Sequence, residues 1–401
     1  MTPNLLARFI NSHQYDIRRS GNGRWIDQKC ALDSVCFVAD CILEYIRVGG
    51  SQPFQSPQIW RSEYAKSNVQ AIFAKPDPTI RSTLDEYNKF FRQPMKMLAA
   101  AGVLSEYKDG IAIQFSVSNI DVLEYIARRE RNSYEFLCLY IQKTLIDSGL
   151  WDSFESFFDE QTKESLDELK SKFSAFCTRY TPINTKTEAD RIFIKVLNPL
   201  ACKNHKKGIV KGRLSHSIIT FNTIVYNQPN WRDVQAGKDK NVARGDFNVV
   251  QSNEQLYQYQ VSRAMKNLRQ FNDKYNNGKS EIQDKFSIGE IATHIHHIFP
   301  RNEFPTIADY IENLIALTSG QHLQLAHWKG TTRINKDYQY DCLINKTASI
   351  RNNLIENTGE TIIYDYEDFM FVLDTGLNTD YFSGLPLNDY GSVIKGIDLN
   401  Y

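Results

Sequence analysis

Long apolar runs are missing from this chain. No stretch approaches the roughly 20 apolar residues that a transmembrane helix needs, and the N-terminus lacks the hydrophobic segment of a secretory signal. No CxxC pair occurs, and the seven cysteines are an odd number that gives no disulfide framework. These absences predict a cytoplasmic protein in a reducing compartment, with no membrane partner.

The chain has no formal net charge, since its 47 basic residues balance its 47 acidic residues. A neutral chain does not coat polyanions generally, but local patches can still bind nucleic acid. Residues 201–216 contain five basic residues and no acid, whereas residues 152–170 contain seven acids and two lysines. The first run predicts either a loop that grips a phosphate backbone or a mobile linker. Its candidate DNA-binding residues are Lys206, Lys207, Lys211 and Arg213.

The length of 401 residues exceeds what one hydrophobic core usually supports, so more than one domain is expected. The patterns predict an α+β, multidomain chain whose N-terminal part is mostly helical. Helices are expected over 28–48, 56–74 and 84–103, the last kinked or interrupted at Pro94. Two strand-like runs around Asp109-Gly110 then predict a hairpin.

Three helices followed by a hairpin is the order of a winged helix-turn-helix module. In such a module the third helix, which carries Lys89, Arg92 and Lys96, would enter the major groove of DNA. The alternative is a plain helical subdomain whose basic residues are merely solvated. A change to a Pro-, Gly- and Lys-rich composition near residue 200 suggests a boundary. The predicted domains are a recognition domain at 1–119, a helical connector at 120–200 and a catalytic domain at 201–401.

Histidine is scarce, with eight in the chain, yet three of them fall within "THIHHIF" at residues 293–299. The alternating pattern predicts a strand with His294 and His296 on one face and His297 on the other. Two adjacent strand histidines cannot easily bind the same ion, but they can divide the work between metal binding and proton transfer. Downstream, "NLIAL" predicts a second strand after Asn313, and "SGQHLQLAH" predicts a helix carrying His322 and His327.

The series "HHIFP…ENLIAL…QH" resembles the HNH motif of the ββα-metal nuclease superfamily, over roughly residues 290–330. The resemblance implies that His296 and His322 bind a divalent metal and that His297 is the general base. It also implies that Asn313 braces the intervening loop. Imidazole suits the base because it is largely neutral at cytoplasmic pH and can take a proton from water. The competing interpretation is a set of core or surface histidines without chemistry.

The chain departs from the family in two places. Many members hold a structural zinc through CxxC pairs, but Thr318 and Gln321 stand there, so no structural zinc is predicted. Some members have a third ligand four residues after the helix histidine. Here His327 lies five residues on, about 140° around a regular helix, which predicts a phosphate contact or a helix-end residue instead. His294 is expected just outside the ligand set, and Arg301 and Arg333 could clamp the phosphate.

A nuclease motif preceded by some 280 residues suggests cleavage directed by the chain's own recognition module. The resemblance therefore implies a type II restriction endonuclease that cuts double-stranded DNA as a homodimer, with Mg²⁺ the expected metal and Mn²⁺ or another divalent ion as alternatives. A mobile-element or phage-defence nuclease, including one that depends on modified bases, is the first alternative. A non-catalytic DNA-binding regulator is the second. A secreted toxin nuclease fits poorly with the absent signal.

Overall fold

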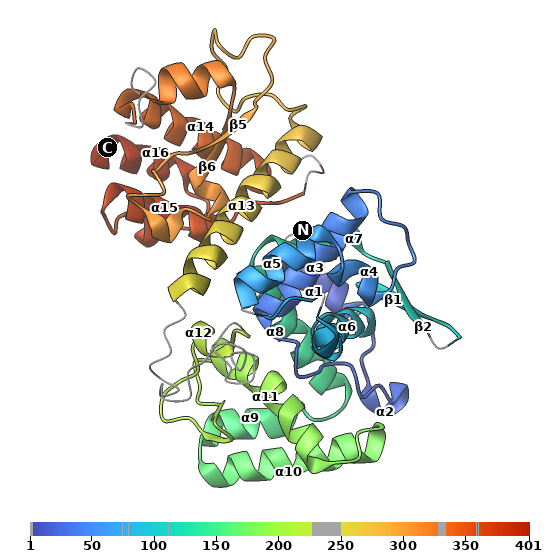
Figure 1. Ribbon diagram of the computed structural model, residues 1–401. Coiled ribbons are helices and arrows are strands. Elements are labelled where there is room, and N and C mark those ends of the chain that lie inside the picture. Colours follow the sequence, from blue (N-terminus) through green and yellow to red (C-terminus); the bar gives the residue numbers. More distant parts are fainter. Residues whose placement is uncertain are drawn as a thin grey trace. The chain divides into compact units, whose positions relative to one another are not determined.

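The computed structural model describes residues 3–73, 75–78, 80–110, 112–226, 250–327, 334–357, 359 and 361–401 (Figure 1). The chain forms two compact units, Met1–Gln255 and Leu256–Tyr401. The fold is α+β and mostly helical, with three small antiparallel sheets among the described residues. Within those ranges, no helix combines the length and the apolarity needed to cross a bilayer.

Unit 1 is built almost entirely from helices around α3 (Leu32–Arg47), which is buried on most of its surface. The remaining helices are α1 (Pro3–Asn11), α2 (Ile17–Ser20), α4 (Ser56–Trp60), α5 (Glu63–Phe73), η1 (Arg81–Thr83), α6 (Leu84–Ala100), α7 (Ile120–Arg128), α8 (Glu130–Asp147), α9 (Trp151–Glu160), α10 (Lys163–Tyr180), α11 (Lys186–Lys203) and α12 (Phe221–Ile224). The seven cysteines of the chain are free thiols, and all but Cys202 are buried.

The predicted N-terminal helices are confirmed with two changes. The segment expected as one helix over 56–74 is divided into α4 and α5 by a turn at Arg61 and Ser62. Helix α6 continues through Pro94 instead of being interrupted there. It stops before Gly102, whose φ of +80° is a left-handed conformation that favours glycine.

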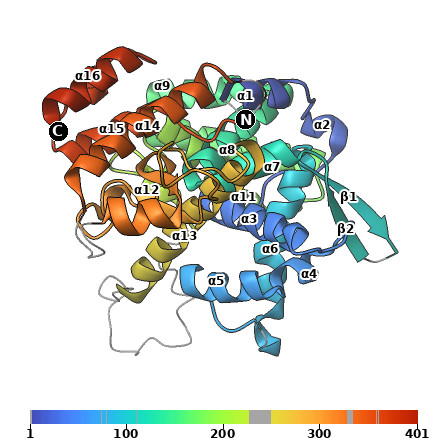
Figure 2. The same ribbon diagram turned by 90° about the horizontal axis from the view of Figure 1, so that it is seen from above.

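The predicted hairpin is also confirmed. Strands β1 (Leu104–Asp109) and β2 (Ala112–Val117) pair antiparallel, with Leu104 opposite Val117 and Asp109 opposite Ala112. Phe54, between α3 and α4, forms an isolated antiparallel bridge with Phe115 of β2. Phe54 and Phe115 exchange two backbone hydrogen bonds, of 2.8 and 2.7 Å. The hairpin extends away from the helices of its unit in both ribbon views (Figures 1 and 2).

The predicted domain boundaries do not match the units. Helices α7 and α8 pack directly against α3, so residues 120–200 belong to the same unit as the preceding helices. Position 200 falls inside α11, and the two units divide at 255/256 instead. Composition suggested position 200 because the basic segment that follows is rich in lysine and glycine.

That basic segment contains a hairpin and lies inside unit 1, so it does not link the two units. Strands β3 (Ile209–Val210) and β4 (Arg213–Leu214) pair antiparallel around the turn at Lys211 and Gly212. The Asn198 side chain of α11 holds the hairpin, since it accepts a hydrogen bond from the Ile209 amide (2.8 Å) and donates one to its carbonyl (2.9 Å).

Unit 2 encloses one small sheet. Its strands are β5 (His294–His297) and β6 (Leu314–Leu317). Around them lie α13 (Val250–Tyr275), which begins just before the unit, η2 (Pro305–Ile307), η3 (Ile311–Asn313), η4 (Gln321–Ala326), α14 (Lys336–Leu354), α15 (Tyr366–Leu377), η6 (Phe382–Gly384) and α16 (Tyr390–Asn400). All four residues of β6 are buried, so this strand lies at the centre of the unit's hydrophobic core.

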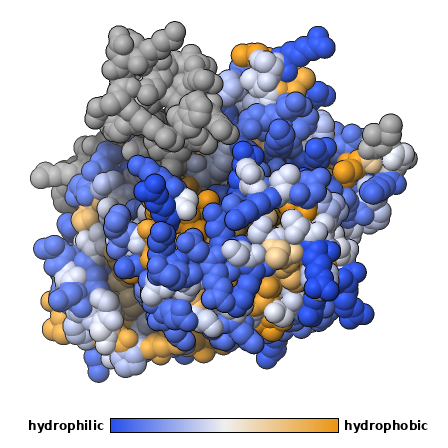
Figure 3. All heavy atoms as spheres, turned by 90° about the horizontal axis from the view of Figure 1, so that it is seen from below, coloured by the Kyte–Doolittle hydropathy of each residue, from blue (hydrophilic) through white to orange (hydrophobic). Residues whose placement is uncertain are grey.

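Exposed apolar side chains include Val48, Ile288 and Leu387. On the face shown in Figure 3, hydrophobic residues form small groups between hydrophilic ones. Such scattered exposure is normal for a protein surface and points to no particular partner.

Candidate metal centre

Strand β5 orients the histidines of the "HIHH" segment. It pairs with β6 so that His294 lies opposite Leu317, His296 opposite Ile315 and His297 opposite Leu314. Because side chains alternate along a strand, His294 and His296 share one face and His297 points to the other. The ring contacts agree with this alternation, since the imidazoles of His294 and His296 both contact the imidazole of His322.

Two charged residues distant in sequence fix the small sheet. Arg269 on α13 donates hydrogen bonds to the carbonyls of Ala292 (3.2 Å) and Thr293 (2.7 Å), just before β5 begins. The Glu281 carboxylate accepts a hydrogen bond from the Ala316 amide of β6 (2.9 Å). Neither residue was predictable from sequence, because nothing in their local pattern connects them to the histidines.

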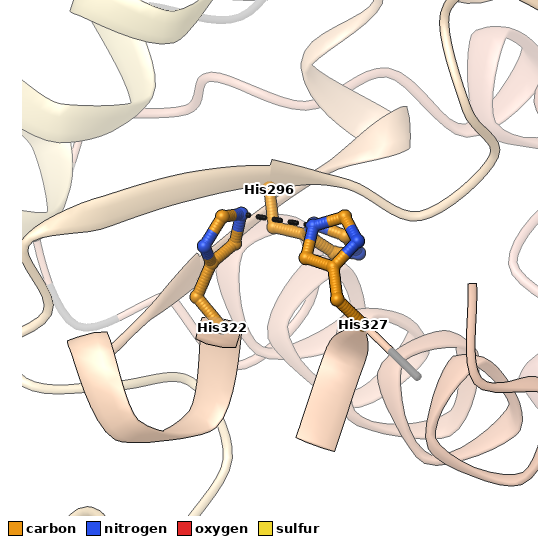
Figure 4. A group of neighbouring side chains, drawn as sticks. All are labelled: His296, His322 and His327. Atoms are coloured by element: carbon orange, nitrogen blue, oxygen red, sulfur yellow. Dashed lines mark hydrogen bonds between the residues drawn. The ribbon is translucent and has the colours of Figure 1, made fainter. Parts of the chain in front are cut away.

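The helical segment after β6 is wound more loosely than a regular helix. Residues Gln321–Ala326 form a π-helix, in which hydrogen bonds join residues five apart. His327, five residues after His322, therefore returns to the same side. Their Nε2 atoms lie 3.3 Å apart (Figure 4). The expected separation of 140° between these two histidines was wrong, because it assumed a regular α-helix.

His296, His322 and His327 form one cluster, called here the histidine triad. Each residue offers one ring nitrogen, and the three atoms lie within 4.8 Å of one another. The side chains converge from β5 and from the two ends of the π-helix (Figure 4). Two nitrogens bound to one tetrahedral zinc-sized ion would lie about 3.3 Å apart, the distance observed between His322 and His327.

The triad is held neutral. Burial lowers the pKa of His296 to about 3, and the imidazoles of His322 and His327 add to the effect. Burial likewise lowers the pKa of His322 to about 4, with contributions from His294 and His327. The pKa of His327 is lowered by burial as well. Metal ligands must be deprotonated, so all three rings are in the form that binds a cation at neutral pH.

Within the described ranges, the ring nitrogens opposite to the cluster lack the acceptor to which a metal-bound imidazole usually donates its other N–H. The Nδ1 atoms of His322 and His327 are buried and have no hydrogen-bond partner among the described residues. If both Nε2 atoms present lone pairs to an ion, both Nδ1 atoms carry hydrogens. Three neutral nitrogen donors without a carboxylate suit Zn²⁺, Ni²⁺ or Co²⁺ better than Mg²⁺, which prefers oxygen ligands.

His294 lies beside the triad. Its ring stacks on that of His322, with centroids 4.6 Å apart and planes 17° apart. Its Nδ1 contacts the Thr293 hydroxyl at 3.0 Å. The position therefore resembles that of a packing neighbour of a ligand more than that of a ligand.

His297 is oriented by a backbone carbonyl on the other face of β5. Its Nε2 lies 3.0 Å from the Ala308 oxygen, and since a carbonyl only accepts, Nε2 carries the hydrogen. The remaining nitrogen, Nδ1, is then the one with a free lone pair. Burial lowers the pKa of His297, and the nearby charge of Arg301 lowers it further, against the opposing effect of the Ala308 bond. His297 is therefore a neutral acceptor at pH 7.

Asn313 ties the loop between the strands together. Its Oδ1 accepts a hydrogen bond from the Phe299 amide (2.8 Å), and its Nδ2 donates to the carbonyls of Phe299 (3.0 Å) and Ile307 (3.2 Å). The side chain is fully buried. Because Ile307 immediately precedes Ala308, this brace also positions the carbonyl that orients His297.

A second polar brace begins the π-helix. The buried Gln321 Oε1 accepts hydrogen bonds from the Ser280 hydroxyl (2.6 Å) and the Thr318 amide (3.0 Å), and Nε2 donates to the Ile282 carbonyl (2.8 Å). The Thr318 hydroxyl donates to the Phe286 carbonyl (3.0 Å). Gln321 and Thr318 thus fasten residues 280–286 to the site.

The other candidate residues are dispersed. Arg301 is exposed near His297, while Arg333 lies outside the described residues. Lys89 and Arg92 are exposed on α6, and Lys96 pairs with Glu106 at 3.1 Å. Lys211 and Arg213 are exposed on the β3–β4 hairpin, and Lys206 and Lys207, which precede it, are half-buried.

No protein-family model, curated protein or solved structure matches this chain. The geometry and chemistry of the described residues are therefore what bears on its function.

Proposed function

We propose that the chain is a metal-dependent DNA endonuclease of the HNH type that hydrolyses phosphodiester bonds, acting as a site-specific restriction enzyme. The observation that carries this proposal is the placement of two kinds of histidine on one strand. His296, a member of the histidine triad, projects from one face of β5, and His297 projects from the opposite face. A plain structural cluster would not need a neighbouring imidazole whose tautomer is set by a carbonyl. In this proposal β5, β6 and η4 are the ββα-metal core of unit 2, and α3 to β2 are a winged helix in unit 1.

His296, His322 and His327 would hold the cation, which extends the expected ligand pair by one residue. When bound, the cation would neutralise charge on the scissile phosphate and on the leaving 3′ oxygen. The donor set leads us to propose a transition metal such as Zn²⁺, Ni²⁺ or Co²⁺ in place of Mg²⁺.

His297 would act as general base. Its Nδ1 would remove a proton from water as the water oxygen bonds to phosphorus, and the bond from phosphorus to the 3′ oxygen breaks in line. The products would be a 5′ phosphate and a 3′ hydroxyl, the latter protonated by solvent. Asn313 would maintain the loop that holds His297 in its tautomer. Arg301, whose charge lowers the pKa of His297, would contact a neighbouring phosphate.

The test is cleavage of supercoiled plasmid by the full chain, stripped of metal and then supplied separately with Zn²⁺, Ni²⁺, Co²⁺, Mn²⁺ and Mg²⁺. Discrete bands that EDTA abolishes would support a site-specific nuclease, and a smear would indicate a non-specific one. Plasmids from methylating and non-methylating hosts would reveal dependence on modified bases. Sedimentation would test the proposed homodimer.

The matched variants are His297→Ala and His216→Ala. His216 is an exposed histidine in unit 1. Loss of cutting in the first and not in the second would support the role of His297. Absence of cutting by the unaltered chain with every metal would contradict the enzyme proposal and favour a DNA-binding regulator.

A further inference from the structure

A groove in unit 1 lies where the end of α3 meets α4 and α5. Its volume is about 1130 Å³, slightly above the roughly 300–1,000 Å³ that small-molecule pockets usually have. The three helices contact one another, and they lie together in both ribbon views (Figures 1 and 2). We call this feature the α3–α5 groove, and the side chains that give it its chemistry are Tyr45, Gln55, Gln58, Arg61, Tyr64 and Asn68.

Two phenol rings form the larger apolar surfaces of the groove. Tyr45 is half-buried, and its ring packs edge to face against the buried Phe54, with centroids 5.8 Å apart. Gly50 permits this position, because a Cβ atom there would lie 2.3 Å from the Tyr45 ring. Tyr64 is also half-buried, and its hydroxyl donates a hydrogen bond to Asp40. Both rings are therefore held in place, and rings of this kind stack on flat heterocycles.

Amide side chains line the same groove and retain unused hydrogen-bonding groups. Gln58 accepts a hydrogen bond from the Gln55 amide (2.6 Å) and donates one to the Tyr45 hydroxyl (3.3 Å), which occupies one of its two N–H groups. Asn68 donates to the Tyr64 carbonyl (2.8 Å), and its Oδ1 has no partner among the described residues. The groove thus offers one donor and one acceptor, the two kinds of group that the edge of a nucleobase presents.

The charges that line the groove are unequally matched. Glu44 and Glu63 both lie in its wall, but Arg47 pairs with Glu44 at 3.0 Å and Lys66 pairs with Glu63 at 2.8 Å. Arg61 is exposed and makes no ion pair with any residue in the described ranges. The unmatched charge is therefore a guanidinium, whose planar set of donors binds phosphate through paired hydrogen bonds.

We propose that the α3–α5 groove binds a nucleotide. The base stacks on the rings of Tyr45 and Tyr64. Its edge hydrogen-bonds to Gln58 and Asn68, and its phosphate accepts hydrogen bonds from Arg61. The ligand is either a free nucleotide or one nucleotide turned out of a DNA duplex, since both present the same base and phosphate. Only the second source rests on the proposed function, because the groove lies within unit 1 and its groups require no metal.

The test is calorimetric titration of the full chain in EDTA, which keeps metal from the histidine triad and so prevents phosphate from binding there. The probes are the four deoxynucleoside 5′-monophosphates, the corresponding nucleosides and orthophosphate. Arg61→Gln removes the phosphate contact, and Asn68→Leu removes a base contact. Arg179→Gln is the matched control, because Arg179 is also exposed and lies over an adjacent ring. Its guanidinium is 5.2 Å from the Tyr180 centroid, compared with 4.8 Å between Arg61 and Trp60.

We expect at least one monophosphate to bind and Arg61→Gln to weaken it by about tenfold or more, because hydrogen bonds to charged groups are the stronger ones. The same variant should change the affinity for the nucleoside by less than about twofold, since the nucleoside has no phosphate. Asn68→Leu should weaken nucleotide and nucleoside alike, and Arg179→Gln should weaken neither. Because Arg61 is exposed, its replacement tests the proposal without disturbing the core.

Two short duplexes identify the source of the nucleotide, one fully paired and one with a single unpaired base. Tighter binding of the second duplex, lost in Arg61→Gln, would assign the groove to a nucleotide of DNA, whereas equal binding of both would assign it to free nucleotides. The proposal would be overturned if no monophosphate bound and the duplexes bound equally. It would also be overturned if orthophosphate bound as tightly as the nucleotides, or if Arg61→Gln weakened nucleotide and nucleoside equally. No cleavage is measured, so failure of the nuclease proposal would leave a free-nucleotide site intact.

Discussion

The Nε2 atom of His322 lies 3.3 Å from the Nε2 atom of His327, although four residues separate them along the chain. In a regular helix, residues four apart are neighbours on one face, whereas residues five apart are not. The π-helix takes up one additional residue in its turn, so the five-residue step places two imidazoles together. π-Helices of this kind are frequent at functional sites.

The first prediction concerns metal affinity. Replacing His296, His322 or His327 by alanine should weaken binding of Co²⁺ or Zn²⁺ at least about 100-fold, because even residues outside the ligand set commonly contribute 10–100-fold. His294→Ala should have a smaller effect, since His294 stacks on a ligand without completing the cluster. Competition with a chelator gives the affinities, and His216→Ala serves as the control. If His294→Ala weakened metal binding as much as the triad variants do, His294 would be a ligand and the proposed ligand set would be wrong.

The second prediction separates the base from the ligands. His297→Ala should lower the cleavage rate about 10²–10⁴-fold, the usual contribution of a general base, while leaving the affinity for Co²⁺ unchanged. The reason is that His297 projects from the opposite face of β5. Single-turnover cleavage and the visible spectrum of bound Co²⁺ measure the two properties on one preparation. A change in the Co²⁺ spectrum would place His297 among the ligands.

Much of this site was predictable from sequence, because it depends on short-range patterns. Alternation in "HIHH" correctly assigned His294 and His296 to one face of a strand and His297 to the other. The apolar run "NLIAL" likewise predicted strand β6, although Ser319 and Gly320, expected as a turn, are already helical. What could not be predicted was the winding of this helical segment, because no local residue specifies π over α geometry. His327 was therefore placed on the wrong side.

The longer-range errors have a similar cause. Composition suggested a boundary at residue 200, but burial of α11 against its neighbours decides where a unit ends. The Phe54–Phe115 pairing joins segments 61 residues apart, and a single bridged residue leaves no periodic signal. The contacts of Glu281 and Arg269 with the small sheet were likewise not predictable. Both residues lie outside the histidine motif, and no periodic pattern connects them to it.

The third prediction tests the brace at the start of the π-helix. Gln321→Met should weaken Co²⁺ binding by about 10–100-fold even though no ligand is removed, because Gln321 fixes the turn that carries His322. It should also alter the Co²⁺ spectrum, which a general loss of stability would not do. Gln324→Met is a matched control, since that side chain is exposed on the same π-helix. An unchanged spectrum in Gln321→Met would mean that the turn forms without this brace.

The fourth prediction is a pH dependence of the metal-free protein. The pKa of His296 is lowered to about 3 in the folded chain, from an ordinary value near 6.5. The unfolded chain therefore binds a proton that the folded chain does not, and stability is retained above pH 6.5 and lost as the pH falls towards 3. At pH 5 the loss should reach about 2 kcal/mol. Hydrogen exchange of β5 and β6 amides at two pH values measures it, and His296→Gln should show a smaller decrease.

The last prediction concerns the ion pair beneath the sheet. Lys346 and Glu281 are both buried, with Nζ and Oε2 2.6 Å apart, and Lys346 also donates to the Tyr364 hydroxyl at 3.0 Å. Burial lowers the pKa of Lys346, and the charge of Glu281 opposes that shift. Lys346→Met would leave a carboxylate buried without its cation, so the free energy of opening at β6 should fall by about 3–5 kcal/mol.

The double variant Glu281→Gln with Lys346→Met distinguishes this cause from lost packing. It removes both charges, while the new amide can still accept the hydrogen bond that Ala316 donates in the native protein. Breaking a buried pair is costly because one charge is left behind, and removing both often costs little. Hydrogen exchange should therefore show most of the stability restored in the double variant. If the double variant is as unstable as Lys346→Met alone, the lysine stabilises unit 2 by filling space and not by neutralising Glu281.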